Sequence, residues 1–284
     1  MARLVSWLFV PGANERFLAK LPSIRPDVAV LDLEDGLDPK ELLPARERVA
    51  DALREVRYPA VRLALRTHPV TTPGFLKDAA TLGPALAVLI LPKVSSNTEV
   101  LEAASVLGDL GLSNVKIVTL IESAEGVRNA FKILSAHPAV EGVALGTEDL
   151  AADLGLPFHV NDDPFIEEGR KELLNAARSQ LIITATAAGI PWRIDAQALT
   201  LGDFALVESA AMKARARGFT GMFAVHPAQV AALARGFLPT PSEIDRARDV
   251  LAASDREGAR SHPGRMVDEA VLRQARRTLD AVGE

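Results

Sequence analysis

The sequence contains no cysteine, and this absence removes several classes of chemistry at once. Disulfide frameworks, catalytic thiolates, iron–sulfur clusters and cysteine-based zinc sites all need a residue that the chain lacks. No apolar run reaches the roughly 20 residues needed to cross a bilayer. The N-terminal stretch MARLVSWLFVPG is apolar but is not followed by a cleavage site of small residues, so we do not interpret it as a signal peptide. We therefore expect a cytoplasmic protein with no membrane partner.

The chain also lacks an excess of positive charge. It has 32 Lys and Arg against 37 Asp and Glu, for a formal net charge of −5. Non-specific nucleic-acid binding needs a basic surface, so we expect no nucleic-acid partner. This balance still allows a local basic pocket for a phosphorylated substrate or cofactor.

Short apolar runs alternate with helical patterns along most of the chain. The runs are continuous rather than alternating, as is typical of parallel strands covered on both faces. Apolar residues between them recur at three- and four-residue steps, which indicates helices. Ser96 and Glu99 form a capping box, a signature of a helix N-terminus. The expected strands are Val5–Val10, Val28–Leu33, Val61–Leu65, Ala87–Leu91, Val115–Ile121, Gly142–Gly146, Pro191–Ile194 and Met222–Val225.

Eight strand–helix units within about 235 residues predict an α/β protein with a (β/α)8 TIM barrel, a fold that usually takes about 250 residues. The alternative is an open doubly wound sheet, but no G-x-G-x-x-G follows the first strand. We expect residues 1–237 to form the barrel and residues 238–284 a small C-terminal helical extension. That extension reads as a helix over Ile244–Ala253, a polar linker over Asp255–Gly264 and a closing helix over Val267–Val282. It is too small to stand alone, so we expect it to cover its own barrel or a neighbour's.

Ionisable residues follow nearly every expected strand, and in a barrel these ends converge on one mouth. In chain order they are Glu34 and Asp35, Arg66 and His68, Lys93, Glu122, Glu148 and Asp149, Asp195, and His226. Acids beside bases indicate an anionic substrate chelated by a metal ion, with the bases stabilising a developing enolate or oxyanion. Mg²⁺ binds one or two carboxylates together with water and substrate oxygens. Taken alone, Glu122 and Asp149 could equally cap or complement neighbouring helices.

An ordered set of motifs carries a specific resemblance. LFVPGANERFLAK, LDLEDGLDPKE, LPKV, LIESAEGV, LGTEDLAADLG, GFTGMFAVHPAQV and GRMVDEAVLRQARR span the chain from about Arg3 to Arg277. Together they resemble the citrate lyase beta-subunit-like family of the HpcH/HpaI aldolase/citrate lyase superfamily, which includes the malyl-CoA and citramalyl-CoA lyases. The resemblance implies a metal-dependent carbon–carbon lyase on a (β/α)8 barrel. Such an enzyme cleaves a 3-hydroxyacyl-CoA by retro-Claisen chemistry into a short acyl-CoA and a 2-oxo acid.

The same resemblance implies roles for individual residues. Glu122 and Asp149 would bind Mg²⁺, with Mn²⁺ as an alternative ion, and Glu34 and Asp35 would order water around it. Arg66 would lie near the thioester oxygen or substrate carboxylate.

Three further positions complete the implied site. The amides of Gly146, Thr147 and Glu148 would hold the oxo-acid carboxylate. Asp268, on the C-terminal segment, would act as acid/base in the site of a neighbouring subunit within a homotrimer or a dimer of trimers. Lys93 is a further substrate-binding candidate. Alternatively, Lys93 forms only a salt bridge at the mouth. A Schiff-base role for Lys93 is possible but disfavoured, because the metal already supplies the electron sink.

Some positions depart from the family pattern. His68 stands where the family pattern has Asn after the third strand, so the resemblance leaves the role of Arg66 intact but does not fix which substrate is selected. The loop in RIDAQALTLGDFA differs from the family's, and residues 158–165 have no assigned role. The alternative functions are a citrate lyase beta subunit acting on a citryl thioester, a 2-oxo acid aldolase without CoA, and a non-catalytic homologue that binds a CoA thioester.

Overall fold

The computed structural model describes residues 3–35, 37–157, 163–197, 202–257, 261–262 and 265–284. Eight parallel strands hydrogen-bond in chain order, and β1 pairs with β8 to close the barrel. All eight expected strands are present, which confirms the (β/α)8 prediction over the open sheet. The strands are β1 (Ser6–Pro11), β2 (Val28–Asp32), β3 (Arg62–Arg66), β4 (Leu86–Leu91), β5 (Lys116–Ile121), β6 (Val140–Leu145), β7 (Trp192–Asp195) and β8 (Gly221–Ala224).

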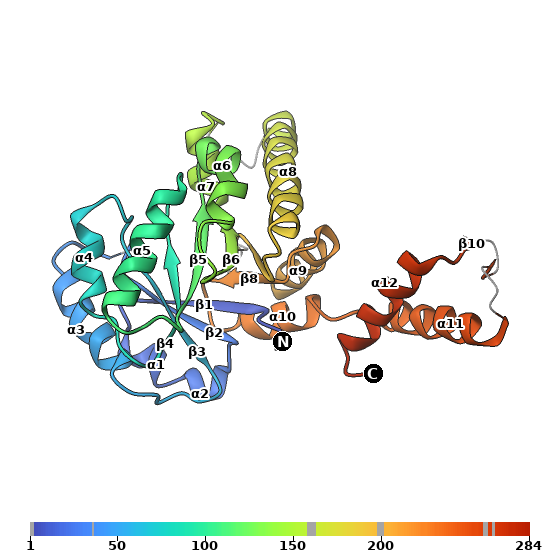
Figure 1. Cartoon of the computed structure of the whole chain (residues 1–284), viewed down its shortest axis with the longest axis horizontal. Coiled ribbons are helices and arrows are strands. Elements are labelled where there is room, and N and C mark those ends of the chain that lie inside the picture. Colours follow the sequence, from blue (N-terminus) through green and yellow to red (C-terminus); the bar gives the residue numbers. More distant parts are fainter. Residues whose placement is uncertain (1–2, 36, 158–162, 198–201, 258–260, 263–264) are drawn as a thin grey trace.

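Helices cover the outside of the barrel between successive strands (Figure 1). The predicted capping box opens α5, where the Ser96 and Glu99 side chains bond the backbone amides of the first turn. The barrel helices are α1 (Glu15–Leu18), α2 (Leu21–Ile24), α3 (Leu42–Leu53), α4 (Pro73–Ala79), α5 (Asn97–Asp109), α6 (Ala124–Leu134), α7 (Thr147–Asp153), α8 (Pro164–Ala187), α9 (Phe204–Arg217) and α10 (Gln229–Gly236).

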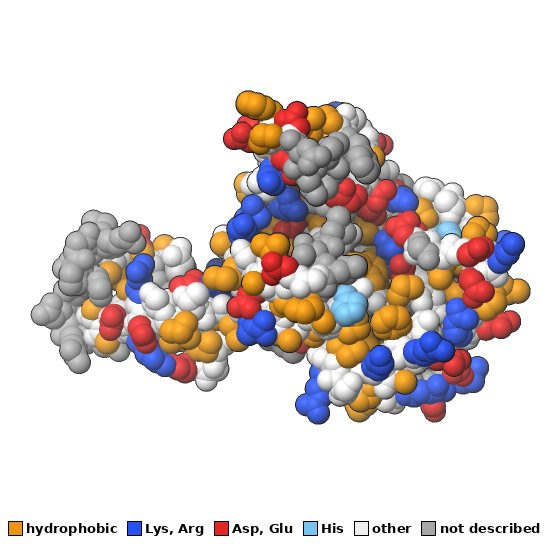
Figure 2. All heavy atoms as spheres, turned by 180° about the vertical axis from the view of Figure 1, so that it is seen from behind, with side chains coloured by type: hydrophobic (Ala, Val, Ile, Leu, Met, Phe, Trp, Pro, Cys, Tyr) orange, Lys and Arg blue, Asp and Glu red, His pale blue; other side chains and the backbone are white. Residues whose placement is uncertain are grey.

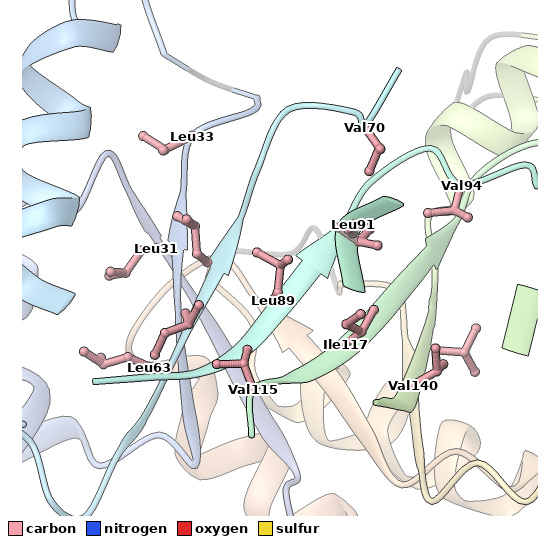
Figure 3. Close-up of a cluster of buried hydrophobic side chains, with 14 of the residues drawn as sticks. Leu31, Leu33, Leu63, Val70, Leu89, Leu91, Val94, Val115, Ile117 and Val140 are labelled. Atoms are coloured by element: carbon pink, nitrogen blue, oxygen red, sulfur yellow. The ribbon is translucent and has the colours of Figure 1, made fainter. Parts of the chain in front are cut away.

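Side chains of each strand alternate between two apolar cores, because successive residues of a strand point to opposite faces. The outer core lies between strands and helices, and Figure 3 shows part of it, including Leu31, Leu63, Leu89 and Ile117. The inner core fills the barrel and contains, among others, Val30, Ala64, Val88, Leu120 and Ala144. A residue just after a strand therefore points into the mouth when it is two residues beyond an inward-facing residue of that strand.

An aromatic stack runs through the barrel interior and ends beneath a charged group. Trp192 packs edge-on against Trp7, with ring centroids 6.0 Å apart, and Trp7 lies edge-on to Phe223 at 6.5 Å. Phe223 packs on Phe9 at 4.9 Å, and the guanidinium of Arg66 lies 4.8 Å above the Phe9 ring. A cation over an aromatic face is attracted by the ring's quadrupole. The stack thus forms a rigid floor for the strand-end residues.

The C-terminal segment projects from the barrel as a separate arm (Figures 1 and 2). It contains α11 (Pro241–Glu257), β9 (Ser261–His262), β10 (Arg265–Met266) and α12 (Glu269–Asp280). α11 and α12 pack on each other through Val250, Val267 and Ala275. The expected linker over Asp255–Gly264 is partly wrong, because α11 continues to Glu257 and β9 pairs with β10 in an antiparallel ladder. The division of the chain at residue 237 stays a prediction.

Within the described part of the chain, every helix falls short of the length and apolar character that a membrane span requires.

Candidate active site

A cavity of about 270 Å³ opens at the carboxyl ends of the strands. Its walls include Asp32, Arg66, Glu122, Gly146 and Asp149. A larger cavity of about 570 Å³ lies outside the barrel between α1 and α3. We assign the site to the mouth because the strand-end carboxylates converge there, as they do in barrels of this type.

Arg66, the last residue of β3, is buried and surrounded by acids. Its Nε and Nη2 donate to the two carboxylate oxygens of Asp32, both at 2.7 Å, in a bidentate pair. Its Nη1 lies 3.0 Å from Glu34 and 3.2 Å from Asp35. Burial works against the charge, but the bond with Asp32 and the charges of Glu34 and Asp35 outweigh it and raise the pKa of Arg66. Arg66 is therefore a permanent cation held in a fixed orientation.

Lys93 and Glu34 form a second ion pair at the mouth, with 3.0 Å between Nζ and Oε1. Glu34 is almost fully buried, and its contacts with Lys93 and Arg66 are ion pairs rather than aligned hydrogen bonds. Burial raises the pKa of Glu34, and the charge of Arg66 opposes that effect. For Lys93, burial acts against the ammonium, but contact with Glu34 dominates and raises its pKa. The predicted barrel-mouth salt bridge of Lys93 is thus present.

Glu122 follows β5 in phase with Val118 and Leu120, so its side chain turns inward. Its Oε1 accepts a 3.0 Å hydrogen bond from the Lys93 amide, and Lys93 adopts a left-handed φ of 53° to provide it. Its other oxygen lies against Gly146, where an added Cβ would approach Oε2 within 2.5 Å. Burial, the nearby charge of Glu34 and a hydrogen bond with Asp149 together raise the pKa of Glu122 to about 8. The structure therefore brings the two predicted metal ligands into contact.

The segment after β6 holds its position through several bonds. The Gly146 amide donates to the Ile121 carbonyl at 3.0 Å, so it is already bonded within the barrel, and its binding of the oxo acid stays a prediction. The amides of Thr147 and Glu148 open α7 and have no partner within that helix. Glu148 pairs at 3.2 Å with Arg170 of α8, which also donates to the Pro157 carbonyl. Glu148 thus anchors the segment, and both Glu148 and Asp149 line the cavity.

Glu122 does not cap α6, since that role belongs to Ser123, whose hydroxyl accepts from the Gly126 amide at 3.0 Å. The plain interpretation of Glu122 as a helix cap is therefore wrong. Asp149 does lie in the first turn of α7, so a dipole role and a ligand role are compatible there.

Several strand-end residues lie away from the mouth. Asp195 is out of phase with the inward Ile194 and pairs with Arg178 of α8 at 2.9 Å. His68 turns to α4, where its Nδ1 lies 2.7 Å from the buried carboxylate of Asp78. Asp268 caps α12 in the arm by accepting from the Val271 amide at 2.9 Å. Most of the loop over residues 158–165 and part of the loop after β7 lie outside the described residues.

Sequence reasoning overlooked three residues of the mouth. Asp32 is the bidentate partner of Arg66, and Phe9 supports that guanidinium from below. Gln197, two residues beyond the end of β7, also lines the cavity. Asp32 carried a usable signal, because it follows Val28 and Val30 at two-residue steps and must point inward with them.

The model of the HpcH/HpaI aldolase/citrate lyase family matches residues 5–227 of the chain. The chain belongs to this family. The family member shares 34% identity with a citrate lyase subunit beta-like protein of Deinococcus radiodurans, over 98% of this chain and 97% of that protein. It shares 28% identity with an L-malyl-CoA/beta-methylmalyl-CoA lyase of Cereibacter sphaeroides, over 94% of this chain and 91% of the lyase. The predicted resemblance is confirmed.

A solved structure also resembles this family member over its full length. It is protein CitE from Mycobacterium tuberculosis in complex with magnesium, acetoacetate and coenzyme A, with a TM-score of 0.84 and 29% identity. The alignment covers 100% of this chain and 99% of that one. The extent of the match includes the C-terminal arm as well as the barrel.

The donor set of this family member fits Mg²⁺. Among the described residues, no group of three or more His, Asp or Glu side chains is arranged around a common metal position. Mg²⁺ does not require one, because it usually retains water and binds one or two carboxylates. Glu122 and Asp149 would provide that pair, and burial, followed by the neighbouring carboxylates of Glu34 and Asp149, raises the pKa of Glu122. A divalent cation between them would remove the repulsion between these carboxylates.

Proposed function

We propose that this chain is a Mg²⁺-dependent carbon–carbon lyase that cleaves a 3-hydroxyacyl-CoA of the malyl-CoA or citramalyl-CoA type. Its products would be a short acyl-CoA and a 2-oxo acid, formed by retro-Claisen cleavage. The observation that carries the proposal is the contact between Glu122 and Asp149 beside the fixed guanidinium of Arg66, in a mouth where acids outnumber cations.

The chain's own residues divide the work between the two halves of the substrate. Glu122 and Asp149 hold the Mg²⁺ end of the site, where the bound ion would supply Lewis-acid polarisation of substrate oxygens. The amides of Thr147 and Glu148 face the oxo-acid carboxylate at the start of α7, where donor groups without helical partners favour an anion. Arg66 stabilises the enolate charge that develops on the thioester oxygen as the bond breaks.

Glu34, Asp35 and Lys93 position Arg66 and Glu122, and they do not touch the bond that breaks. Asp32, Glu34 and Asp35 fix the plane of the Arg66 guanidinium, and a group held in this way needs no reorganisation during the reaction. Lys93 orients Glu122 through its amide and neutralises Glu34 through its ammonium. In the proposal Lys93 also contacts the substrate at the rim of the mouth.

Proton transfer at the acyl carbon falls to Asp268 of a neighbouring subunit. Within one chain, α12 lies in the arm beside the barrel, so Asp268 serves a second copy more readily than its own mouth (Figure 1). Apolar side chains on α8 and α9 support an assembly, since Phe165, Ile183 and Leu206 are 84%, 70% and 57% exposed. We propose a homotrimer or a dimer of trimers.

The test is a panel of 3-hydroxyacyl-CoA thioesters incubated with the purified protein and Mg²⁺ and analysed by mass spectrometry. At least one thioester should yield a 2-oxo acid together with an acyl-CoA whose acyl group has two or more carbons. EDTA should stop the reaction. The absence of turnover across the panel, combined with the absence of Mg²⁺ binding by calorimetry, would overturn the proposal. Turnover of a 2-oxo acid aldol without CoA, or of a citryl thioester alone, would favour the corresponding alternative.

A further inference from the structure

A second cavity, of about 250 Å³, lies at the opposite end of the barrel from the mouth. It opens where β1, β7 and β8 begin and where α9 and α10 end. Leu4, Trp192, Phe219 and Phe237 form its apolar wall, and Arg3 and Arg215 contribute guanidinium groups. Its volume is just below the range of about 300–1,000 Å³ that holds drug-sized ligands, so it suits a smaller molecule.

The cationic side of this cavity is incompletely neutralised. Arg3 donates to the carbonyls of Phe237 and Ala281, at 2.6 and 2.9 Å, and forms no ion pair with the described residues. Arg215 pairs through Nη2 with Glu243, while its Nε is buried without a hydrogen-bond partner among them. Burial and the charge of Arg215 both lower the pKa of Arg3, and the charge of Asp27 only partly opposes this.

Neighbouring groups do not supply the missing negative charge. One oxygen of Asp27 is occupied by the amides of Val5 and Ser6 and the Ser6 hydroxyl, each at 2.9 Å. Arg193 follows the cavity residue Trp192, and its Nε is buried without a partner among the described residues. Burial, and then the charge of Arg277, lower the pKa of Arg193. The barrel end and the arm thus bring arginines together in excess over the carboxylates that pair with them.

We propose that this cavity binds a small organic carboxylate, with its carboxylate between Arg3 and Arg215 and its apolar body against Trp192, Phe219 and Phe237. Guanidinium groups match the planar, two-oxygen geometry of a carboxylate. The apolar wall favours an aliphatic or aromatic body over a fully hydrated inorganic anion. This site is separate from the mouth, and the proposal is independent of the lyase reaction.

The tryptophan fluorescence of the protein can report on binding at this site. It contains two tryptophans, Trp7 and Trp192; Trp192 lines the cavity and Trp7 packs against it. Cyclohexanecarboxylate should change the intrinsic fluorescence of the full-length protein saturably, with half-saturation on the order of 1 mM. Cyclohexylmethanol, the uncharged analogue of similar shape, should produce no saturable change. An equal response to both compounds, or no saturable response to the acid, would overturn the proposal.

Two variants with a matched control locate the response. Arg3→Gln should weaken carboxylate binding about tenfold or more, because a charge-assisted bond is lost. Arg217 is on the same end of α9 as Arg215 but exposed, so Arg217→Gln should leave carboxylate binding unchanged. Glu243→Gln keeps a side chain that suits the helix cap but frees Arg215, so it should tighten binding.

If Arg3→Gln detaches the arm from the barrel or fails to fold, carboxylate binding by Glu243→Gln still tests the proposal. Tighter carboxylate binding in Glu243→Gln supports the site, whereas unchanged or weaker binding contradicts it. Binding that survives Arg3→Gln in a folded protein would place the carboxylate elsewhere, in the mouth for example, and would equally overturn the proposal.

Discussion

The carboxyl group of Glu122 is buried beside other acids, and these surroundings raise its pKa from 4.5 to about 8. Between these two values the folded protein binds a proton that the unfolded chain has released. The stability of the metal-free protein should therefore fall as the pH rises from about 4.5 to about 8. Urea unfolding at several pH values across this range measures the free energy of unfolding. Glu122→Gln should flatten the dependence of that free energy on pH. A slope unchanged by Glu122→Gln would mean that another group is responsible.

Mg²⁺ affinity should have the opposite pH dependence, because a carboxyl group must lose its proton before it binds a metal. Binding should strengthen roughly tenfold per pH unit below about 8, with release of about one proton per ion. Calorimetry in two buffers of different ionisation enthalpy measures that release. Affinity independent of pH between 6 and 8 would show that Glu122 is not the titrating ligand.

Gly146 tests how tightly the metal site is built. A Cβ at this position would meet the Glu122 carboxylate at 2.5 Å and displace it. Gly146→Ala should weaken Mg²⁺ binding by about 10- to 100-fold, the usual cost of disturbing groups that orient a ligand. Gly169→Ala is the matched control, since nothing lies within 4 Å of its added Cβ on exposed α8. Equal Mg²⁺ affinity in the two variants would contradict the arrangement of Glu122.

At the residue scale, the sequence predicted part of the group of residues that meet at the mouth but not how they pair, and it also placed His68 and Asp195 there, which the structure turns away. Glu34, Arg66, Lys93, Glu122 and Asp149 all lie where the strand ends placed them. The binding of Asp32 by Arg66 was missed because Asp32 lies inside the strand, where a continuous apolar run concealed its inward phase. The occupied amide of Gly146 depends on the β5–β6 register, which spacing along the chain does not reveal.

At the scale of the elements, the contact between Arg178 and Asp195 ties α8 to the end of β7. Asp195 is 3% exposed at its side chain, so removing its cation would leave a buried, unpaired charge. Arg178→Gln should lower the free energy of unfolding by about 3 kcal/mol. Adding Asp195→Asn should restore part of that loss, and Arg217→Gln should change stability by less than about 0.5 kcal/mol. Additive losses in the double variant would contradict the pairing.

The strands were predictable because a buried parallel strand leaves a continuous apolar run, and all eight runs correspond to strands. The role of Asp195 was not predictable from strand-end position alone, since its phase relative to Trp192 and Ile194 turns it outward. The linker prediction failed over its first residues because the polar composition after Ala253 also suits a helix, and α11 continues to Glu257.

At the scale of the whole molecule, the proposal that Asp268 serves a neighbouring subunit predicts complementation. Asp268→Asn and Arg66→Gln should each lack activity as pure assemblies. Hybrids formed by co-expression would contain some mouths with an intact Arg66 facing an intact Asp268 from another chain, so activity should return. Mixtures of pure, non-exchanging assemblies are the control. Hybrids that remain inactive would show that both residues must come from one chain, whereas an active Asp268→Asn assembly would show that Asp268 has no role.

The central claim is that the mouth cleaves a carbon–carbon bond with Mg²⁺ held by Glu122 and Asp149. The most direct test follows one accepted thioester, malyl-CoA or citramalyl-CoA, and quantifies every product. We predict acetyl-CoA and the 2-oxo acid in equal amounts, no free CoA, and loss of the reaction with EDTA or in Asp149→Asn. Free CoA without a 2-oxo acid, or equal rates with and without EDTA, would contradict the account.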